Sequence, residues 1–143
     1  MMIRELTAAD KDVVIDMMRV FYASAAVYTN GSEEIFENDV ENCINENPYL
    51  EGYVFEENGV LLGYAMVAKS FSTEFGKPCM WIEDIYLKPE CRGQGIGIQF
   101  MNFMKEKYPH AIHRLEVEEE NETAMKLYKK AGFTTLPYVE MMR

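Results

Sequence analysis

Two adjacent carboxylates stand in the middle of the apolar segment that begins the stretch WIEDIYLKPECRGQGIG, residues 81–97. Burying a carboxylate is costly unless another group compensates its charge, so Glu83 and Asp84 need a reason to be there. One reason is chemical, because partial burial raises the pKa of a carboxylate and makes it a base that can take a proton from an ammonium ion. The other is structural, a salt bridge to a cation such as Arg114 or Lys69.

Three glycines at alternate positions follow, where the next helix should begin. A Walker loop would need a lysine and a hydroxyl residue after its last glycine, and a Rossmann turn would need a small residue where this chain has isoleucine or phenylalanine. The pattern that remains is Arg92-x-x-Gly95-x-Gly97. With Gly93, it leaves backbone N–H groups free of Cβ atoms at a helix N-terminus, which attracts phosphate, and Arg92 is a further phosphate donor. The alternative is a purely structural turn.

A third group of residues shares one face of an expected helix in LEVEEENETAMKLYKKAGF, residues 115–133. Asn121 is a typical N-cap residue, Ala124 and Tyr128 lie four residues apart, and all three fall on the same face. A small residue between two polar ones indicates that a ligand passes over this face. The alternative for Tyr128 is an ordinary place in the hydrophobic core.

Six strands and four helices are expected to position these groups, from the periodicity of the apolar residues. Their order, β-α-α-β-β-β-α-β-α-β, predicts an α/β fold with a mixed sheet, helices on both faces and one βαβ crossover in its second half. The expected strands are residues 2–6, 52–57, 60–71, 79–87, 112–118 and 133–142, and the expected helices are residues 8–21, 32–47, 94–107 and 122–131.

Local signals set several of these limits. Asn58-Gly59 favours a type I′ hairpin turn, and Ser32 begins a helix whose first turn is acidic. Gly132 is placed for a left-handed helix C-cap. Pro137 indicates that the last expected strand lies at a sheet edge or contains a bulge.

The expected strand at 79–87 is apolar on both faces, which is typical of a central strand covered on both sides. Regular alternation sends Glu83 and Asp84 to opposite faces, so at most one of them should face a substrate. The same alternation places Trp81, Ile85 and Leu87 on one face, and Ile82 and Tyr86 on the other.

Composition limits the class of protein. The 143 residues, with 48% hydrophobic and 27% charged side chains, predict one globular domain over residues 1–143. The net charge of −10 argues against a nucleic-acid partner, whose phosphates it would repel, and suits a cationic small molecule. The three cysteines, Cys43, Cys79 and Cys91, form no CxxC pair, so neither a disulfide framework nor a zinc site is expected.

No segment predicts a membrane span or a secretory leader. The N-terminus carries Arg4, Glu5 and Asp10 without an apolar run, and the longest apolar stretch is interrupted by Asp16 and Arg19. We therefore expect a soluble, cytoplasmic protein that has no membrane partner.

The two motifs together resemble the GNAT superfamily of acetyl-CoA-dependent N-acetyltransferases. Arg92-Gly93-Gln94-Gly95-Ile96-Gly97 is similar to the pyrophosphate loop of that family. Asn121, Ala124 and Tyr128, followed by Gly132-Phe133, are similar to its second cofactor motif. The resemblance covers essentially the whole chain, because the expected hairpin, central strand and terminal strand follow the family's order.

The resemblance implies a GNAT-like fold in which the strands at 79–87 and 112–118 splay apart and admit the pantetheine arm of acetyl-CoA. The arm would pair with the backbone of Ile85, Tyr86 and Leu87, while residues 93–98, ending at Ile98, hold the pyrophosphate. A backbone N–H of the central strand would polarise the thioester carbonyl. Tyr128 would protonate the departing thiolate, since a phenol stays protonated at neutral pH. No metal is implied.

The Glu-Asp pair also resembles the diamine and polyamine N-acetyltransferases of the superfamily, in which the glutamate faces the acceptor amine. Glu83 is therefore the expected base and ammonium anchor, and Asp84 a structural residue that could also line the substrate site. Tyr28, Glu118 and Glu140 are further candidates for that site.

The leading hypothesis is direct transfer of an acetyl group from acetyl-CoA to a primary amine of a small cationic metabolite, polyamine-like or amino-acid-like. Acetylation of a protein N-terminus or lysine, and a non-catalytic acyl-CoA-binding module, are the alternatives. Retention of Glu83 and Tyr128 argues against a pure binder, which needs neither. The resemblance also raises the alternative of a homodimer.

Overall fold

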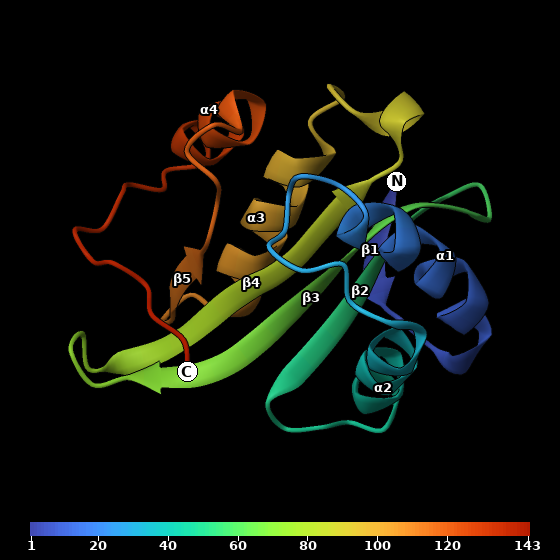
Figure 1. Cartoon of the computed structure of the whole chain (residues 1–143), viewed down its shortest axis with the longest axis horizontal. Coiled ribbons are helices and arrows are strands. Elements are labelled where there is room, and N and C mark those ends of the chain that lie inside the picture. The colour runs from blue at the N-terminus through green and yellow to red at the C-terminus, as the bar shows by residue number, and fades with distance from the viewer.

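A mixed five-stranded sheet organises the chain, and the computed structural model describes all of its residues, 1–143. The strands lie in the order β1-β2-β3-β4-β5, antiparallel from β1 to β4, with β5 parallel to β4 (Figure 1). The predicted fold class is confirmed. The strands are β1 (Met2–Glu5), β2 (Leu50–Glu57), β3 (Val60–Ser72), β4 (Lys77–Leu87) and β5 (Ile112–Leu115).

Helices cover both faces of the sheet. In Figure 1, α1 and α2 lie in front of the strands and α3 lies behind them. Two short 3₁₀ turns, at Ala8–Asp10 and Pro89–Cys91, precede α1 and α3. The helices are α1 (Lys11–Tyr22), α2 (Glu33–Ile44), α3 (Ile96–Lys107) and α4 (Glu122–Lys130), each close to its predicted range.

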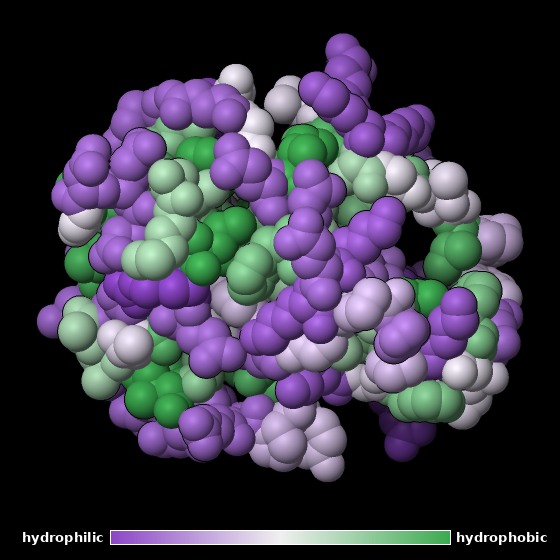
Figure 2. Space-filling model, turned by 180° about the vertical axis from the view of Figure 1, so that it is seen from behind, coloured by the Kyte–Doolittle hydropathy of each residue, from purple (hydrophilic) through white to green (hydrophobic).

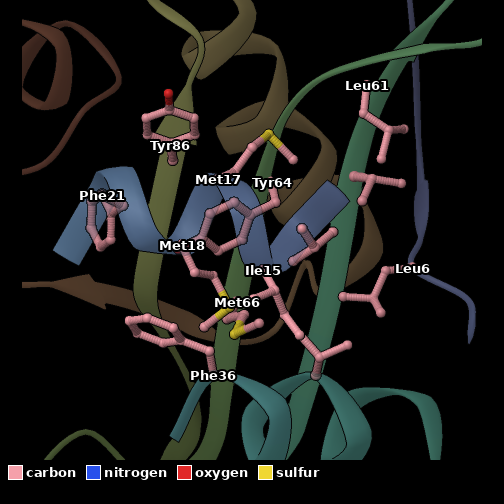
Figure 3. Packing of buried hydrophobic residues seen from close by; sticks show 13 residues of the cluster. Leu6, Ile15, Met17, Met18, Phe21, Phe36, Leu61, Tyr64, Met66 and Tyr86 are labelled. Atoms are coloured by element: carbon pink, nitrogen blue, oxygen red, sulfur yellow. The ribbon is translucent and has the colours of Figure 1, made fainter. Parts of the chain in front are cut away.

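Two hydrophobic cores result, one on each face. Figure 3 shows the first, in which Met17 and Met18 of α1 and Phe36 of α2 pack on side chains of β3 such as Tyr64 and Met66. The second lies under α3 and includes Phe55, Val67, Ile82, Phe100 and Met104. The sheet is therefore covered on both sides along β4, as its apolar sequence predicts.

The local signals of the sequence are confirmed. The Ser32 hydroxyl accepts a hydrogen bond from the backbone N–H of Ile35 at 3.1 Å. Asn58 and Gly59 both have positive φ, 52° and 77°, as a type I′ turn requires. Gly132, which follows Ala131, the C-cap residue of α4, has a φ of 98°. These residues set the limits of their elements before any tertiary contact is considered.

The predicted strand over residues 133–142 is wrong. The chain after α4 forms no strand, and Figure 1 shows it as an isolated red segment beside β5. Pro137 has no N–H to give to a ladder, and β5 ends at Leu115 instead of residue 118, so it offers a partner of only four residues. The outer edge of β5 is consequently free.

The predicted faces of β4 are wrong at Ile82, because the strand contains a bulge. On β3, Met66 pairs with Asp84 and the next residue, Val67, pairs with Ile82. Glu83 is therefore an extra residue with no partner, and it resets the alternation. Ile82 packs under α3 together with Ile85 and Leu87, while Tyr86 packs on the α1 side, so Ile82 and Tyr86 do not share a face.

No helix combines the length and the apolar character needed to cross a membrane.

Candidate active site

The pairing of β4 with β5 stops halfway along β4. Residues Cys79–Ile82 pair with Ile112–Leu115, after which β4 continues to Leu87 with β3 on one side and no strand on the other. In Figure 1 the chain beyond β5 turns away from β4 towards α4. Residues 83–87 therefore present an open backbone edge, including Ile85, Tyr86 and Leu87, to which an extended ligand can hydrogen-bond.

The two predicted carboxylates lie where this open edge begins, but in different environments. Glu83 lies at the bulge with part of its surface exposed and part covered by the protein, whereas only 3% of Asp84 is exposed. The phenols of Tyr22 and Tyr64 donate hydrogen bonds to the two Asp84 carboxylate oxygens, at 2.7 and 2.8 Å. Asp84 is thus satisfied inside the protein, and Glu83 has no protein hydrogen-bond partner.

The salt bridges considered from the sequence are not formed. Lys69 instead bonds Glu51 at 3.1 Å, and the Arg114 guanidinium carbon lies 4.6 Å from the centre of the Trp81 ring. The carboxylates of β4 therefore lack a cationic partner, which an incoming ammonium group could provide.

Burial and neighbouring carboxylates together raise the pKa of several carboxylates near the bulge. Burial, and then the charges of Asp84 and Glu140, raise the pKa of Glu83. Burial raises the pKa of Asp84 to about 6, although its two tyrosine hydrogen bonds oppose the shift. Burial and the charge of Glu83 raise the pKa of Asp39 on α2. Hydrogen bonding to Glu140, followed by burial, raises the pKa of Glu116 to about 7. A bound cation would relieve this repulsion.

The sequence reasoning missed Asp39 and Glu116. Asp39 had a usable signal, since it lies three residues after Phe36 and one before Val40, two buried residues of α2. Glu116 had none, because it belongs to a run of acidic residues that looks like solvated surface. Two predicted candidates, Tyr28 and Glu118, are exposed and make no side-chain hydrogen bond, so their roles stay predictions.

The glycine turn has the geometry of an anion cradle at Gly93 and Gly95. Both have positive φ, 77° and 81°, and no atom lies within 4 Å of the place where a Cβ would stand. Gly95 is also the N-cap of α3, which has no acidic residue in its first turn. Gly97 is different: it is buried, and an added Cβ would lie 2.9 Å from Leu127 on α4. Its lack of a side chain serves the contact between α3 and α4.

The other residues of the turn hold it in place. The Arg92 Nε donates to the Leu87 carbonyl at 3.0 Å, and its guanidinium carbon lies 5.8 Å from the centre of the Tyr86 ring. Gln94 donates to the Glu90 carbonyl at 3.3 Å. The side chain of Ile96 is buried in the core under α3, and Ile98 is partly buried. Arg92 thus connects the turn to the open edge of β4, and its contact with phosphate stays a prediction.

Tyr128 lies on α4, half-buried, with its ring edge against Phe133 at a centroid distance of 6.1 Å. Its phenol makes no hydrogen bond within the protein, and burial raises its pKa, so the oxygen keeps its proton at neutral pH. The predicted cap of this helix is confirmed, because the Asn121 side-chain oxygen accepts from the Ala124 N–H at 3.2 Å. Tyr128 is a free proton donor.

Tyr128 also lines a groove of about 980 Å³ between β5, α3, α4 and the C-terminal segment. Figure 2 shows the groove from behind as the dark opening at the right of the molecule. Glu116 and Glu140 line it as well, whereas Glu83 does not. The structure gathers no group of three or more His, Cys, Asp or Glu side chains that could hold a metal ion.

The residues present fit acetyl-CoA. An extended chain that contains amide groups can hydrogen-bond to the open backbone edge of β4. The space without Cβ atoms at Gly93 and Gly95 lies at a helix N-terminus, where binding of a pyrophosphate is favoured. An open strand edge that leads to such a turn, with a free phenol nearby, is the arrangement of a CoA-dependent acyltransferase.

Comparisons with known proteins agree. The model of the acetyltransferase (GNAT) family matches residues 15–133. The chain belongs to this family and is an acetyltransferase, and the family implies the use of acetyl-CoA. The thialysine N-epsilon-acetyltransferases of Sus scrofa and Bos taurus are 30% and 31% identical to it in alignments that are 152 positions long. Each alignment covers 97% of this chain and 87% of the relative.

Solved structures share the fold at lower identity. A possible acetyltransferase from Clostridium difficile 630 superposes with a TM-score of 0.84 and 19% identity, covering 99% of this chain and 95% of that one. AAC(6')-Iy, in complex with the bisubstrate analogue CoA-S-monomethyl-acetylneamine, gives a TM-score of 0.79 and 16% identity, covering 99% and 96%. The GNAT fold predicted from the two motifs is confirmed.

Coenzyme A is expected to raise the melting temperature, and Gly95→Val to abolish that rise by placing a side chain in the phosphate path. At a hundred times its Kd, the ligand adds about 2.7 kcal/mol, roughly 10 °C for a chain of this size. The measurement is thermal unfolding with and without coenzyme A.

A strained backbone alone would also lower stability, by about 1–2 kcal/mol for a side chain at positive φ. Gly59→Val is the matched control, since Gly59 has a similar φ of 77°, open surroundings and a place in the β2–β3 hairpin. It should melt earlier yet keep the full response to coenzyme A. An unchanged response in a folded Gly95→Val variant would remove the turn from the cofactor site.

Proposed function

We propose that this protein transfers the acetyl group of acetyl-CoA directly to a primary amine of a small cationic metabolite. One observation carries the proposal: Glu83 is the extra residue of the β4 bulge, exposed at the point where the open edge of β4 begins. It has no cationic partner and lies within electrostatic reach of Asp39, Asp84 and Glu140. Such surroundings favour a substrate that carries a positive charge and can give up a proton.

Acetyl-CoA supplies an activated thioester, and the chain's own residues would bind it and move two protons. The open edge at Ile85–Leu87 and the turn at Gly93 and Gly95 would hold it along β4. A backbone N–H of β4 would stabilise negative charge on the carbonyl oxygen. Glu83 would take the proton of the ammonium group, directly or through a water, and the Tyr128 phenol would give its proton to the departing sulfur.

The relatives support a small acceptor. The two mammalian proteins are named for acetylation of the ε-amino group of thialysine, an amino acid with a primary amine. We extend only the class, a primary amine on a small cation, to this chain. The raised pKa values of Glu83 and Asp39 support the same class, because burial and then the charge of neighbouring carboxylates disfavour the ionised forms, and a bound cation would offset both effects.

A thiol-release assay with acetyl-CoA tests the proposal against a panel of thialysine, lysine, diamines, polyamines, aminoglycosides and short peptides. Release of thiol with the small amines, and one acetyl group gained by the amine in mass spectrometry, supports it. Activity with peptides alone would favour the protein acetyltransferase, and binding of acetyl-CoA without turnover on any amine would favour the non-catalytic module.

A homodimer, a cytoplasmic location and a single domain over residues 1–143 stay predictions. The dimer has some structural support, because the free edge of β5 lies beside a C-terminal segment with highly exposed apolar side chains, among them Val139 and Met141. A second copy could cover both. Light scattering after gel filtration should then give twice the 16.6 kDa of one chain, and a mass of 16.6 kDa would contradict the dimer.

A further inference from the structure

The buried carboxylate of Asp84 is held by two tyrosines that come from different layers of the molecule. Tyr64 lies on β3, within the core between the sheet and α1 (Figure 3), and donates to one oxygen. Tyr22 is the last residue of α1 and donates to the other. The hydrogen bond from Tyr64 therefore connects two strands of the sheet. The hydrogen bond from Tyr22 connects the sheet to the C-terminal end of α1.

The ring of Tyr22 is also part of the support for the segment that follows, residues 23–32, which we call the α1–α2 loop. It packs on Phe36 of α2 with ring centroids 5.4 Å apart. The far end of the loop lies on the same two rings, since an added Cβ at Gly31 would be 2.5 Å from Phe36 and 3.5 Å from Tyr22. Both ends of the loop thus depend on where the Tyr22 ring lies.

Little else holds this loop. The Ser24 hydroxyl bonds the Phe21 carbonyl and accepts from the Ala26 N–H, and these are its last hydrogen bonds before Ser32. Val27 packs partly on the α1-side core, and most other residues of the loop are exposed. The hydrogen bond from Tyr22 to a buried charged acceptor is therefore its strongest link to the sheet.

We propose that Asp84 is a positioning residue, which acts through Tyr22 to hold the α1–α2 loop as one wall of the amine site. Asp84 directly follows Glu83 in β4, so the loop is anchored one residue away from the base of the proposed function, on which this inference rests. Tyr22 is expected to act on the acceptor side alone, because its phenol bonds the Asp84 side chain and makes no hydrogen bond to the backbone edge at Ile85–Leu87 or to the glycine turn.

The test compares Tyr22→Phe with Tyr64→Phe, two variants that each remove one phenol from the same carboxylate. Both variants should melt earlier than the parent, because each removes a hydrogen bond to a charged group. Only Tyr22→Phe should raise the KM for the amine, roughly tenfold, with kcat and the KM for acetyl-CoA within about twofold of the parent. An equal rise in Tyr64→Phe would overturn the proposal, because the effect would then follow stability.

A second measurement needs no substrate. Tyr28, 89% exposed in the middle of the loop, is a chymotrypsin site. Cleavage after Tyr28 in the folded protein, followed by intact mass, should be faster in Tyr22→Phe and unchanged in Tyr64→Phe. Equal cleavage rates in the parent and Tyr22→Phe would show that the hydrogen bond does not hold the loop. If the parent acetylates no amine, the proposed function fails, while the cleavage rates still decide whether Asp84 positions the loop.

Discussion

Replacing Tyr128 with phenylalanine is expected to lower kcat about a hundredfold or more, and to leave coenzyme A binding nearly unchanged. The aromatic ring remains, so its packing against Phe133 is kept. The phenol has no hydrogen-bond partner in the protein, so its removal leaves no buried group unsatisfied and costs little stability. What is lost is the proton for the departing sulfur, a general-acid contribution typically worth 10²–10⁴-fold. Steady-state kinetics and thermal shifts with coenzyme A measure both effects.

Tyr138→Phe is the control, because Tyr138 lines the same groove as Tyr128 but bonds the exposed Glu74. It should keep the parent's turnover. If Tyr128→Phe also turns over at the parent's rate, Tyr128 is a packing residue and the acid lies elsewhere.

Replacing Glu83 with glutamine is expected to lower kcat for a cationic amine near neutral pH and to raise its KM. Glutamine keeps the volume of the side chain and removes both the base and the charge that binds the ammonium group. Glu83 is the unpaired residue of the bulge and makes no hydrogen bond within the protein, so the melting temperature should change little. Glu90→Gln, which removes another exposed carboxylate in the 3₁₀ turn after β4, should leave kcat and KM unchanged.

The raised pKa of Glu83 determines how activity should change with pH. Burial and the neighbouring carboxylates raise the pKa of Glu83 above 4.5, so the active, ionised form is lost as the pH falls through that raised value. The parent should show this acidic limb at a pH above 4.5, and Glu83→Gln should lack it. The variant's defect should shrink as the pH approaches about 10, where a primary amine is already deprotonated. Full activity of Glu83→Gln at neutral pH would refute the assignment.

The sequence predicted most of the fold because its signals are local. A hydroxyl cap at Ser32, positive φ at Asn58-Gly59 and a glycine after α4 act within four residues, so no knowledge of distant contacts is needed. The same holds for the glycine turn. The last strand failed for the opposite reason. Residues 133–142 have a strand-like composition, but a strand exists only when another strand pairs with it, and β5, with four residues, ends before it can offer a full partner.

The internal structure of the site depends on distant contacts, and the sequence does not reveal them. The bulge at Glu83 follows from how β4 pairs with β3, not from the residues around it. The partners of Asp84 lie 62 and 20 residues away, at Tyr22 and Tyr64, and neither has a pattern that marks it as a carboxylate partner. The sequence therefore predicts which residues belong to the site, while their environments required the structure.

Because of the bulge, the residue of β4 proposed for the chemistry, Glu83, is not one of the residues that form the sheet and its cores. Without Glu83, Ile82 and Asp84 would be neighbours opposite Val67 and Met66, and the strand would alternate regularly from Met80 to Leu87. Every core side chain of β4 would keep its present face. The sheet thus carries one surplus residue, and that residue is the proposed base. At this position natural variation can change the reaction, by substitution or by loss of the residue, without repacking either hydrophobic core.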